Sequence, residues 1–383
     1  MGVRHRLLLA AVCGVAVASV YVAQPILKPM GRDLVIEPAD TGWLVAIGQI
    51  GYLIGLVLLV PLGDVVDRRR LIAAQLALTG TGMLVTGCAG SAWVAFAGLG
   101  VAGLFAVVVQ TTVAYAAAVA PAAERGRTIG IVTSGVVIGI LGGRVLAGVL
   151  AQAWQWRGVY VVLGLAAVLL AAVVRVALPA DQRRAGATVP LGGLLTERLF
   201  WSRGLIAFFA FASFGTLWSG MALPLADRPW SLGEAQIGLF GLAGLAGALG
   251  AARAGRWADA GRARVVTGAA LVLLTASWAA IAQLTRSLWL LAAGIVVLDF
   301  AVQAAHVSNQ HRLTATYPDR SGTVIGAYMV FYSLGSALGA AATTALYSAG
   351  GWAASSALGA VFAAGALAAW AIGQPARPRL PAR

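Results

Sequence analysis

The stretch GDVVDRRR at residues 63–70 has a second copy in this chain, GRWADAGR at residues 255–262. Each copy opens with glycine, carries an aspartate four residues later and ends with arginine, and the offset between them is 192 residues. Each copy also follows an apolar run that is long enough to cross a bilayer. The repeat therefore predicts a chain that is built from two related halves.

The composition is that of an integral membrane protein. Of the 383 residues, 60% are hydrophobic and only 10% are charged, and the mean hydropathy is +0.87. Soluble domains carry roughly 25% charged residues. Backbone groups at membrane depth must bond within their own segment, so apolar spans of about 20 residues are expected to be helices. The sequence predicts an all-α fold of twelve transmembrane helices, at about 7–28, 41–62, 71–90, 93–118, 128–150, 156–178, 203–224, 234–254, 265–284, 287–312, 321–347 and 352–373.

The longest polar interruption divides these spans into two groups of six. It contains proline, glycine and charges of both signs. We therefore expect an N-terminal six-helix bundle at residues 1–178, a cytoplasmic linker at 179–202, a C-terminal six-helix bundle at 203–373 and a cytoplasmic tail at 374–383.

The arginines indicate the orientation in the membrane. If the N-terminus is inside, the inside loops carry most of the arginines, and the outside loops carry only Lys28, Arg32, Arg157, Arg228 and Arg286. This asymmetry follows the positive-inside rule and predicts that both termini are cytoplasmic. The net charge of +14 alone could suggest a nucleic-acid partner. Such binding needs a basic face on a folded soluble module, which the sequence lacks, so we expect none.

GDVVDRRR resembles the signature loop of the major facilitator superfamily, which has glycine, aspartate four residues on, and then basic residues. GRWADAGR is similar to the second copy of that loop and is closer to the pattern, because it keeps Gly261 before the final arginine. The resemblance covers nearly the whole chain, since span count, linker and both loops agree. It implies two six-helix bundles around a midplane site, and a cytoplasmic gate that involves Gly63, Asp67, Arg68, Gly255, Asp259 and Arg262. The alternative is that these charges only set the topology.

The fifth predicted span, GILGGRVLAG at residues 139–148, combines small residues with a charge. Gly139, Gly143 and Gly148 resemble the glycine-rich fifth-helix motif of antiporters in this superfamily, and small residues allow the close helix approach that a sliding interface between bundles needs. The antiporter pattern usually has proline where this chain has Arg144. Arg144 lies about 24 Å along the span at 1.5 Å per residue. It could extend to the outer headgroups or pair structurally, or it could bind an anionic substrate or an acidic partner across the cavity.

The tenth span carries a polar stripe. In LDFAVQAAHVSNQHR, residues 298–312, Asp299, Gln303, His306 and Gln310 fall at i, i+4, i+7 and i+11, on one face of a helix. Such a stripe must face protein or water and not lipid. By the resemblance, the first, fourth, seventh and tenth helices line the central cavity. Asp299 is therefore the main candidate for carrying a proton or contacting substrate, with a structural hydrogen bond as the alternative. His306 is a second titratable candidate.

Other spans add polar candidates. Tyr21 and Gln24 lie three residues apart in SVYVAQPILKPM, residues 19–30, and Gln110 lies in the fourth span. The first of these stretches resembles a branch of bacterial efflux-type permeases. Trp218, Tyr328 and Tyr332 could contact an amphipathic substrate or could simply pack. Cys13 and Cys88 fall inside predicted spans and are expected to be buried, with no metal site.

The sequence thus predicts a secondary active transporter of a bacterial inner membrane, working as a monomer by alternating access. The favoured activity is proton-coupled efflux of a small organic molecule or drug, in which Asp299 carries the proton and Gln24, Gln110 and Gln303 orient substrate. The proton gradient would be the energy source, without a cofactor. One alternative is a uniporter or importer of sugars or organic anions, with Arg144 holding the anion. A non-transporting sensor is a remote alternative, and no catalytic constellation suggests an enzyme.

Overall fold

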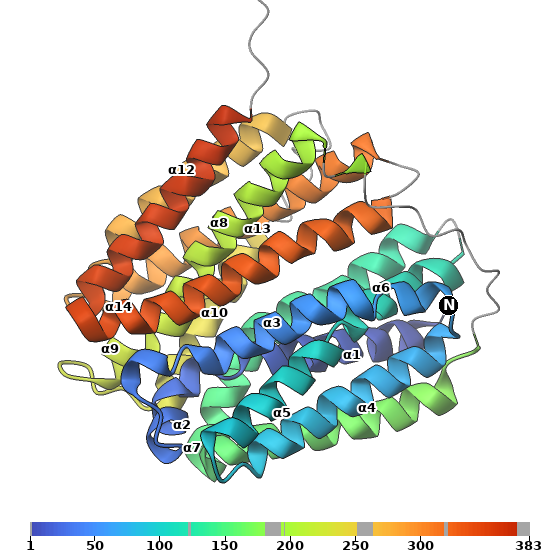
Figure 1. Ribbon diagram of the computed structural model, residues 1–383, viewed down its shortest axis with the longest axis horizontal. Helices are drawn as coiled ribbons and strands as arrows, with labels where there is room; N and C mark the ends of the chain where they lie inside the picture. The colour runs from blue at the N-terminus through green and yellow to red at the C-terminus, as the bar shows by residue number, and fades with distance from the viewer. Residues whose placement is uncertain are drawn as a thin grey trace, which may run out of the picture.

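The computed structural model describes residues 2–121, 124–180, 193–194, 196–250, 263–317 and 321–373. Every regular element in these ranges is a helix (Figure 1). Within them, eight helical segments are long and apolar enough to cross a membrane, and Glu234–Leu249 is a shorter apolar helix.

The N-terminal half forms one bundle, drawn in blue to green in the lower part of Figure 1. Its first helix, α1, lies against α7 and α6 and has a continuous run of buried residues towards its end. The elements are α1 (Val3–Tyr21), η1 (Gln24–Ile26), α2 (Leu27–Asp33), η2 (Pro38–Asp40), α3 (Trp43–Leu58), η3 (Pro61–Asp64), α4 (Arg68–Gly87), α5 (Ala92–Phe105), α6 (Val108–Val119) and α7 (Arg125–Ala177).

The C-terminal half forms the second bundle, drawn in yellow-green to red in the upper part of Figure 1. Its first helix, α8, is the most buried, since every residue from Ala210 to Gly220 is inaccessible. The elements are α8 (Arg198–Gly220), α9 (Ala222–Ala226), α10 (Glu234–Gly250), α12 (Ala263–Ile281), α13 (Leu288–Thr316) and α14 (Ser321–Ile372).

Two of these helices reverse direction inside their length. In α7 the backbone leaves helical geometry at Trp154 and Gln155, and in α14 it does so at Gly350 and Gly351. Gly351 has φ +64°, a left-handed conformation that glycine adopts without steric cost. Each of these helices is therefore a hairpin of two arms, as Figure 1 shows for both.

In both halves, glycines of a long helix allow it to pack closely against the first helix of the same half. An added Cβ at Gly135 or Gly139 of α7 would lie 2.1 or 2.3 Å from the carbonyl oxygens of Ala10 and Gly14 in α1. An added Cβ at Gly335 or Gly339 of α14 would lie 2.0 or 2.1 Å from backbone oxygens of α8. Backbones can approach this closely only where the side chain is absent. The internal repeat seen in the sequence is thus also a repeat of helix packing.

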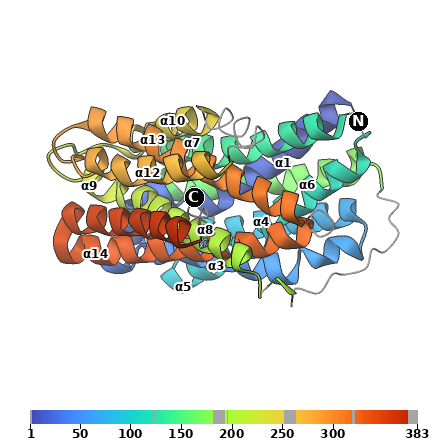
Figure 2. The ribbon, with the colours of Figure 1, turned by 90° about the horizontal axis from the view of Figure 1, so that it is seen from above.

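The bundles contact each other at one end, which we call the far end. It holds α2, α9 and the reversals of α7 and α14. Here α7 packs against α10, and α3 packs against α14 (Figure 2). An added Cβ at Gly42 would lie 2.2 Å from the oxygen of Ala340, and the Gly42 amide donates to Thr344 Oγ1 at 3.1 Å.

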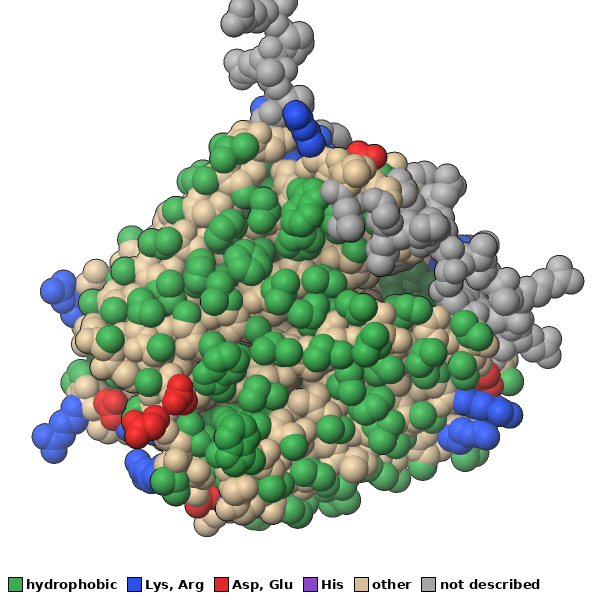
Figure 3. Space-filling model, viewed as in Figure 1, with side chains coloured by type: hydrophobic (Ala, Val, Ile, Leu, Met, Phe, Trp, Pro, Cys, Tyr) green, Lys and Arg blue, Asp and Glu red, His purple; other side chains and the backbone are tan. Residues whose placement is uncertain are grey.

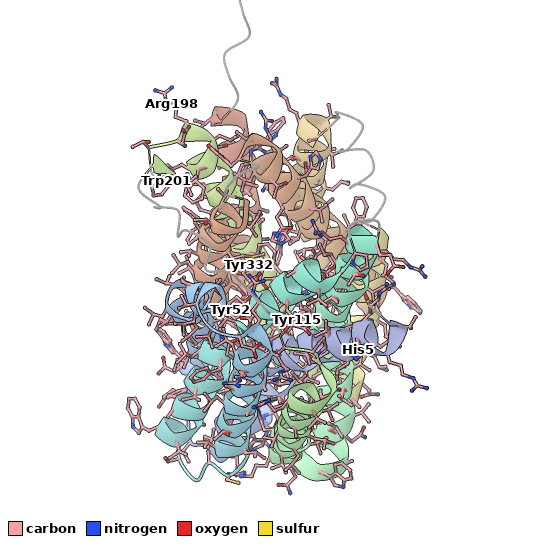
Figure 4. All side chains as sticks on the ribbon, turned by 90° about the vertical axis from the view of Figure 1, so that its right-hand side faces the viewer. His5, Tyr52, Tyr115, Arg198, Trp201 and Tyr332 are labelled. Carbon is pink, nitrogen blue, oxygen red and sulfur yellow. The ribbon has the colours of Figure 1, made fainter. Side chains whose placement is uncertain are left out.

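The opposite end, which we call the linker end, holds the start of α1, the end of α7 and the start of α8. Figure 4 shows Arg198 and Trp201 at the top of the C-terminal bundle, well separated from His5 and Tyr115 of the N-terminal bundle. Figure 3 shows a hollow between the two bodies on this side. The bundles therefore diverge from the far end towards the linker end.

The lateral surface is that of a membrane protein. On the face shown in Figure 3, hydrophobic side chains cover the middle of both bundles, and charged side chains gather at the ends. Exposed large side chains include Trp93, Leu169 and Trp289. Cys13 is buried as expected, but the expectation for Cys88 is wrong: it follows the last residue of α4 and is exposed, because the helix ends before it.

Candidate functional site

Arg144 lies at the centre of the contact between the bundles. It comes from the first arm of α7 and is only 1% exposed. Its Nε donates to Gln24 Oε1 at 2.8 Å, and its Nη1 donates to the Ile140 carbonyl at 2.9 Å. A position in the outer headgroups is therefore excluded for this side chain in the structure. Arg144 is held inside the protein.

Three aromatic rings surround the guanidinium. Its Cζ atom lies 3.8 Å from the ring centre of Trp218 and 5.4 Å from those of Tyr21 and Phe214. Trp218 and Phe214 belong to α8, so the cation of one bundle sits on rings of the other. Each desolvated cation–π contact contributes up to about 2 kcal/mol. These rings replace part of the hydration that Arg144 loses.

Asp299 lies on the other side of the Trp218 contact. It is fully buried on α13, and its Oδ2 accepts a hydrogen bond from Trp218 Nε1 at 3.3 Å. It also interacts electrostatically with Arg144. Trp218 thus touches both charges, one with its ring face and the other with its N–H group.

Both charges keep an atom without a hydrogen-bond partner in the described part of the chain. These atoms are Arg144 Nη2 and Asp299 Oδ1. A buried polar group that lacks a partner costs about 1–3 kcal/mol, and more when it is charged. A purely structural ion pair would gain stability by satisfying these atoms. Because these two atoms have no hydrogen-bond partner among the described residues, Asp299 Oδ1 can accept a proton and either atom can bind a ligand.

Gln24 and Tyr21 join the same centre from the N-terminal bundle. Gln24 follows the last turn of α1, accepts from Arg144 and donates from Nε2 to Ser219 Oγ at 3.4 Å. The Tyr21 hydroxyl is hydrogen-bonded to the Tyr332 hydroxyl of α14. Figure 4 shows Tyr332 and Tyr52, from the two bundles, at the level where the bundles meet. The structure therefore brings Tyr21, Gln24 and Arg144 together with Asp299.

The other polar candidates lie in neighbouring contacts. Gln110 donates to the Tyr52 hydroxyl at 3.2 Å. His306 Nδ1 is 3.0 Å from the Tyr328 hydroxyl, and its Nε2 is 3.1 Å from Gln310 Nε2. Gln303 is half-buried on α13, between Asp299 and His306. Gln303, His306 and Gln310 continue the polar stripe of α13 towards the linker end, whereas Gln110 lies on α6. Among the described residues, none of the four is hydrogen-bonded to Arg144.

Arg203 is a further buried arginine, which the sequence did not single out. Arg203, the first residue of the predicted seventh span, is 1% exposed near the start of α8, and its Nη1 donates to Asn309 Oδ1 at 3.2 Å. Asn309 is buried as well. The helical periodicity of α13 could have indicated that Asn309 faces another helix. Which residue it meets depends on how α8 crosses α13.

The three candidate glycines of α7, Gly139, Gly143 and Gly148, divide between two interfaces. Gly139 and Gly143 lie against Gly14 and Ala18 of α1, inside their own bundle. Gly148 faces the other bundle, because an added Cβ there would lie 2.3 Å from the oxygen of Glu234. Of these three glycines, only Gly148 lies against the other bundle in this structure. The first arm of α7 contacts α1 on one face and α10 on another.

The loop before α4 places Asp67 at the helix N-terminus. Its Oδ1 accepts from the Arg69 amide at 3.0 Å, so it is the N-cap of α4. Arg68 donates from Nε to the Gly63 carbonyl at 3.0 Å and is buried. Gly255, Asp259 and Arg262 lie outside the described residues. The gating role of both loops remains a prediction.

The cap and the gate can be separated by substitution. Asp67→Ala should destabilise the protein by about 1 kcal/mol, because it removes the N-cap, whereas Asp67→Asn should keep the cap. Thermal unfolding of the purified variants measures this difference. If Asp67 also acts in the gate, Asp67→Asn will slow transport while retaining the unfolding temperature. Equal transport by wild type and Asp67→Asn would leave Asp67 with a capping role only.

Several members of this site carried no clear signal in the sequence. Phe214 and Tyr52 look like packing residues in apolar helices, and Ser219 looks like a small interface residue. Trp218 was considered only as a general candidate. Their roles arise from crossings between helices that are far apart in sequence. No group of three or more His, Cys, Asp or Glu residues that could hold a metal occurs in the described ranges.

Comparisons with known proteins identify the family. The sequence model of the Major Facilitator Superfamily matches residues 9–228 and 204–383. The uncharacterized transporter of Escherichia coli O157:H7 is 38% identical over 340 residues, which is 87% of this chain and 86% of that protein. A multidrug resistance protein of Mycobacterium tuberculosis is 31% identical over 138 residues, 36% of this chain and 26% of that protein.

A solved structure shares the fold. A bacterial homolog of the human lysosomal transporter Spinster, in an inward-facing and occupied conformation, superposes with a TM-score of 0.79 at 17% identity. The match covers 97% of this chain and 96% of that one. The two-bundle architecture, the family match and the similarity to transporters lead to one conclusion: this chain is a multi-pass membrane transporter that belongs to the Major Facilitator Superfamily.

Proposed function

We propose that this transporter is a twelve-helix, proton-coupled exporter of a small organic molecule, with both termini in the cytoplasm of a bacterial cell. The hairpins of α7 and α14 each provide two arms, which raises the eight candidate spans to ten. The apolar helix α10 and the 20-residue helix α4 supply the remaining two.

The orientation rests on charge. Arg4, Arg69, Arg70, Arg125 and Arg198 all lie at the linker end. Positive residues are retained on the cytoplasmic side, so the linker end is assigned to the cytoplasm. Because the bundles meet at the far end and diverge at the linker end, the conformer described here is then the inward-facing one.

The observation that carries the coupling proposal is the contact of Arg144, Trp218 and Asp299 across the two bundles. Arg144 moves with the N-terminal bundle, whereas Trp218 and Asp299 move with the C-terminal bundle. The attraction between Arg144 and a charged Asp299 therefore stabilises the conformer in which the far end is closed. A proton on Asp299 removes that attraction. Coupling needs such a differential effect on two conformers.

The direction and the kind of substrate rest on weaker similarities. The relative from Mycobacterium tuberculosis is named as a multidrug resistance protein, and the glycine-rich first arm of α7 is similar to that of antiporters. The aromatic side chains around Arg144 suit a substrate with an apolar or aromatic part. A monomer in the inner membrane fits this activity.

The proposal is tested by a substrate screen in proteoliposomes. Purified protein would be reconstituted with and without an imposed pH gradient, with protein-free liposomes as the control. We expect at least one small organic compound to accumulate inside the liposomes only when the interior is more acidic than the medium, because the outward movement of protons then drives the inward movement of the compound. Equal rates with and without the gradient for a sugar or organic anion would instead identify a uniporter.

A further inference from the structure

The groups around Arg144 at the centre of this protein are of the kind that bind organic cations, and the guanidinium of Arg144 lies among them. Three aromatic rings surround the Arg144 guanidinium, and the carboxylate of Asp299, which accepts a hydrogen bond from one of these rings, attracts it electrostatically. We infer that Trp218, Phe214, Tyr21 and Asp299 form a binding site for an organic cation, and that Arg144 occupies this site as a placeholder in the conformer seen here. The inference rests on the proposed alternating-access cycle and names its substrate class.

The chemistry of the walls is the first argument. Aromatic faces together with a carboxylate are the groups that recognise guanidinium and quaternary ammonium ions. The closest face, that of Trp218, lies 3.8 Å from the guanidinium carbon. Tryptophan gives the strongest cation–π contact of the aromatic residues. The same indole orients the carboxylate by donating to Asp299 Oδ2 at 3.3 Å.

The second argument is that the two bundles contribute different parts of this site. Phe214, Trp218 and Asp299 belong to the C-terminal bundle, whereas Arg144 belongs to the N-terminal bundle. The hydrogen bonds of Arg144 go to Gln24 and to the Ile140 carbonyl, both of which are in its own bundle. When the far end opens, Arg144 therefore moves away with its hydrogen-bond partners. The rings of Phe214 and Trp218 and the carboxylate of Asp299 stay behind, whereas Tyr21 of α1 moves with Arg144.

The carboxylate of Asp299, which remains after Arg144 moves away, explains why a cationic ligand would bind. Without Arg144, Asp299 is a buried carboxylate with an oxygen, Oδ1, that has no partner among the described residues. Leaving a buried charge unpaired costs several kcal/mol, so a cation from solution would bind in place of the guanidinium. Two cations cannot share the site, and the return of Arg144 would expel the ligand.

The surrounding rings favour a cation with an aromatic or branched apolar part. Phe211 packs on Phe214 with ring centres 5.8 Å apart and on Tyr332 at 4.0 Å. This continues the aromatic surface from the guanidinium towards His306, whose ring centre is 5.2 Å from that of Phe211. The apolar part of a ligand would lie along these rings.

Equilibrium binding to purified protein in nanodiscs tests the inference without any gradient. The probes are benzyltrimethylammonium, a cation with one aromatic ring, and benzenesulfonate, an anion of similar size. We expect the cation to bind Arg144→Gln at least about tenfold more tightly than wild type, because the competing guanidinium is gone; tenfold corresponds to 1.4 kcal/mol. Adding Trp218→Leu or Asp299→Asn to Arg144→Gln should remove this gain.

Matched controls use the same substitutions at exposed positions. Arg175→Gln and Trp289→Leu should leave cation affinity unchanged, since both side chains lie on the surface. Arg144→Lys keeps the charge and the occupied site, so it should bind the cation no more tightly than wild type. It also provides the comparison if Arg144→Gln does not fold.

The outcomes separate this inference from the proposed function. Tighter binding of benzenesulfonate to wild type than to Arg144→Gln, or cation affinity that is equal in both, would overturn the placeholder while leaving proton-coupled export intact. The expected gain in cation affinity, together with an absence of proton-driven transport in proteoliposomes, would support the cation site and overturn the proposed coupling.

Discussion

Asp299→Asn is expected to reduce proton-driven transport in proteoliposomes to the level of protein-free liposomes. The substitution keeps the size of the side chain and an oxygen that can accept from Trp218 Nε1, so the packing of α8 on α13 is retained. Asparagine cannot take up or release a proton. The bundles would no longer distinguish a protonated from an unprotonated state, which removes the coupling.

If the substrate is uncharged, the same variant should retain its exchange between the two sides without a gradient, because exchange does not require net proton movement. Exchange of an organic cation should instead be lost together with the carboxylate that binds it. Asp40→Asn is the matched control, since Asp40 is exposed in η2 at the far end. Gradient-driven accumulation by Asp299→Asn at the wild-type rate would show that another group carries the proton. His306, the second titratable residue of the stripe, would then be the next to replace.

Gly148→Ala is expected to shift the protein away from the conformer with a closed far end. The added Cβ would lie 2.3 Å from the Glu234 oxygen and 3.0 Å from the Ala235 Cα, both of which are backbone atoms of the other bundle. Overpacking costs about 1–3 kcal/mol. Since 1.4 kcal/mol corresponds to tenfold, the population with a closed far end should fall by roughly 5- to 140-fold.

Labelling of a single cysteine measures this shift. In a Cys88→Ser background, Cys13 is fully buried, and Ala222→Cys, buried at the far end, should react with a membrane-impermeant maleimide only when that end opens. Labelling should become faster in Gly148→Ala and should not change in Gly130→Ala, where the added Cβ meets nothing within 4 Å.

Gly139→Ala supplies a different comparison. Its Cβ would lie 2.3 Å from the Gly14 oxygen inside the same bundle, so the substitution should lower the unfolding temperature without exposing residue 222. Unchanged labelling in Gly148→Ala would show that α10 can withdraw without opening the far end.

The polar stripe of α13 could be predicted because it depends on spacing alone. Asp299, Gln303, His306 and Gln310 share one face of any α-helix, and a bilayer makes that face turn inward. The structure buries Asp299 accordingly. The two alternatives for Arg144 could not be resolved in the same way. The position of Arg144 along its helix could be predicted from the sequence, but the side of the helix on which its side chain lies, and therefore its contacts, could not.

The sequence by itself determined that the chain is helical, apolar and divided into two related halves, with most of its arginines at one end. These properties follow from composition, helical periodicity and the cost of burying charge, which act along the chain. Only the tertiary structure decided that Arg144 meets Trp218, that Gly148 but not Gly139 faces the other bundle, and that Arg203 is buried against Asn309. Each of these contacts joins helices that are distant in sequence. Their crossing angles result from the summed packing of many side chains, so no local pattern of residues specifies them.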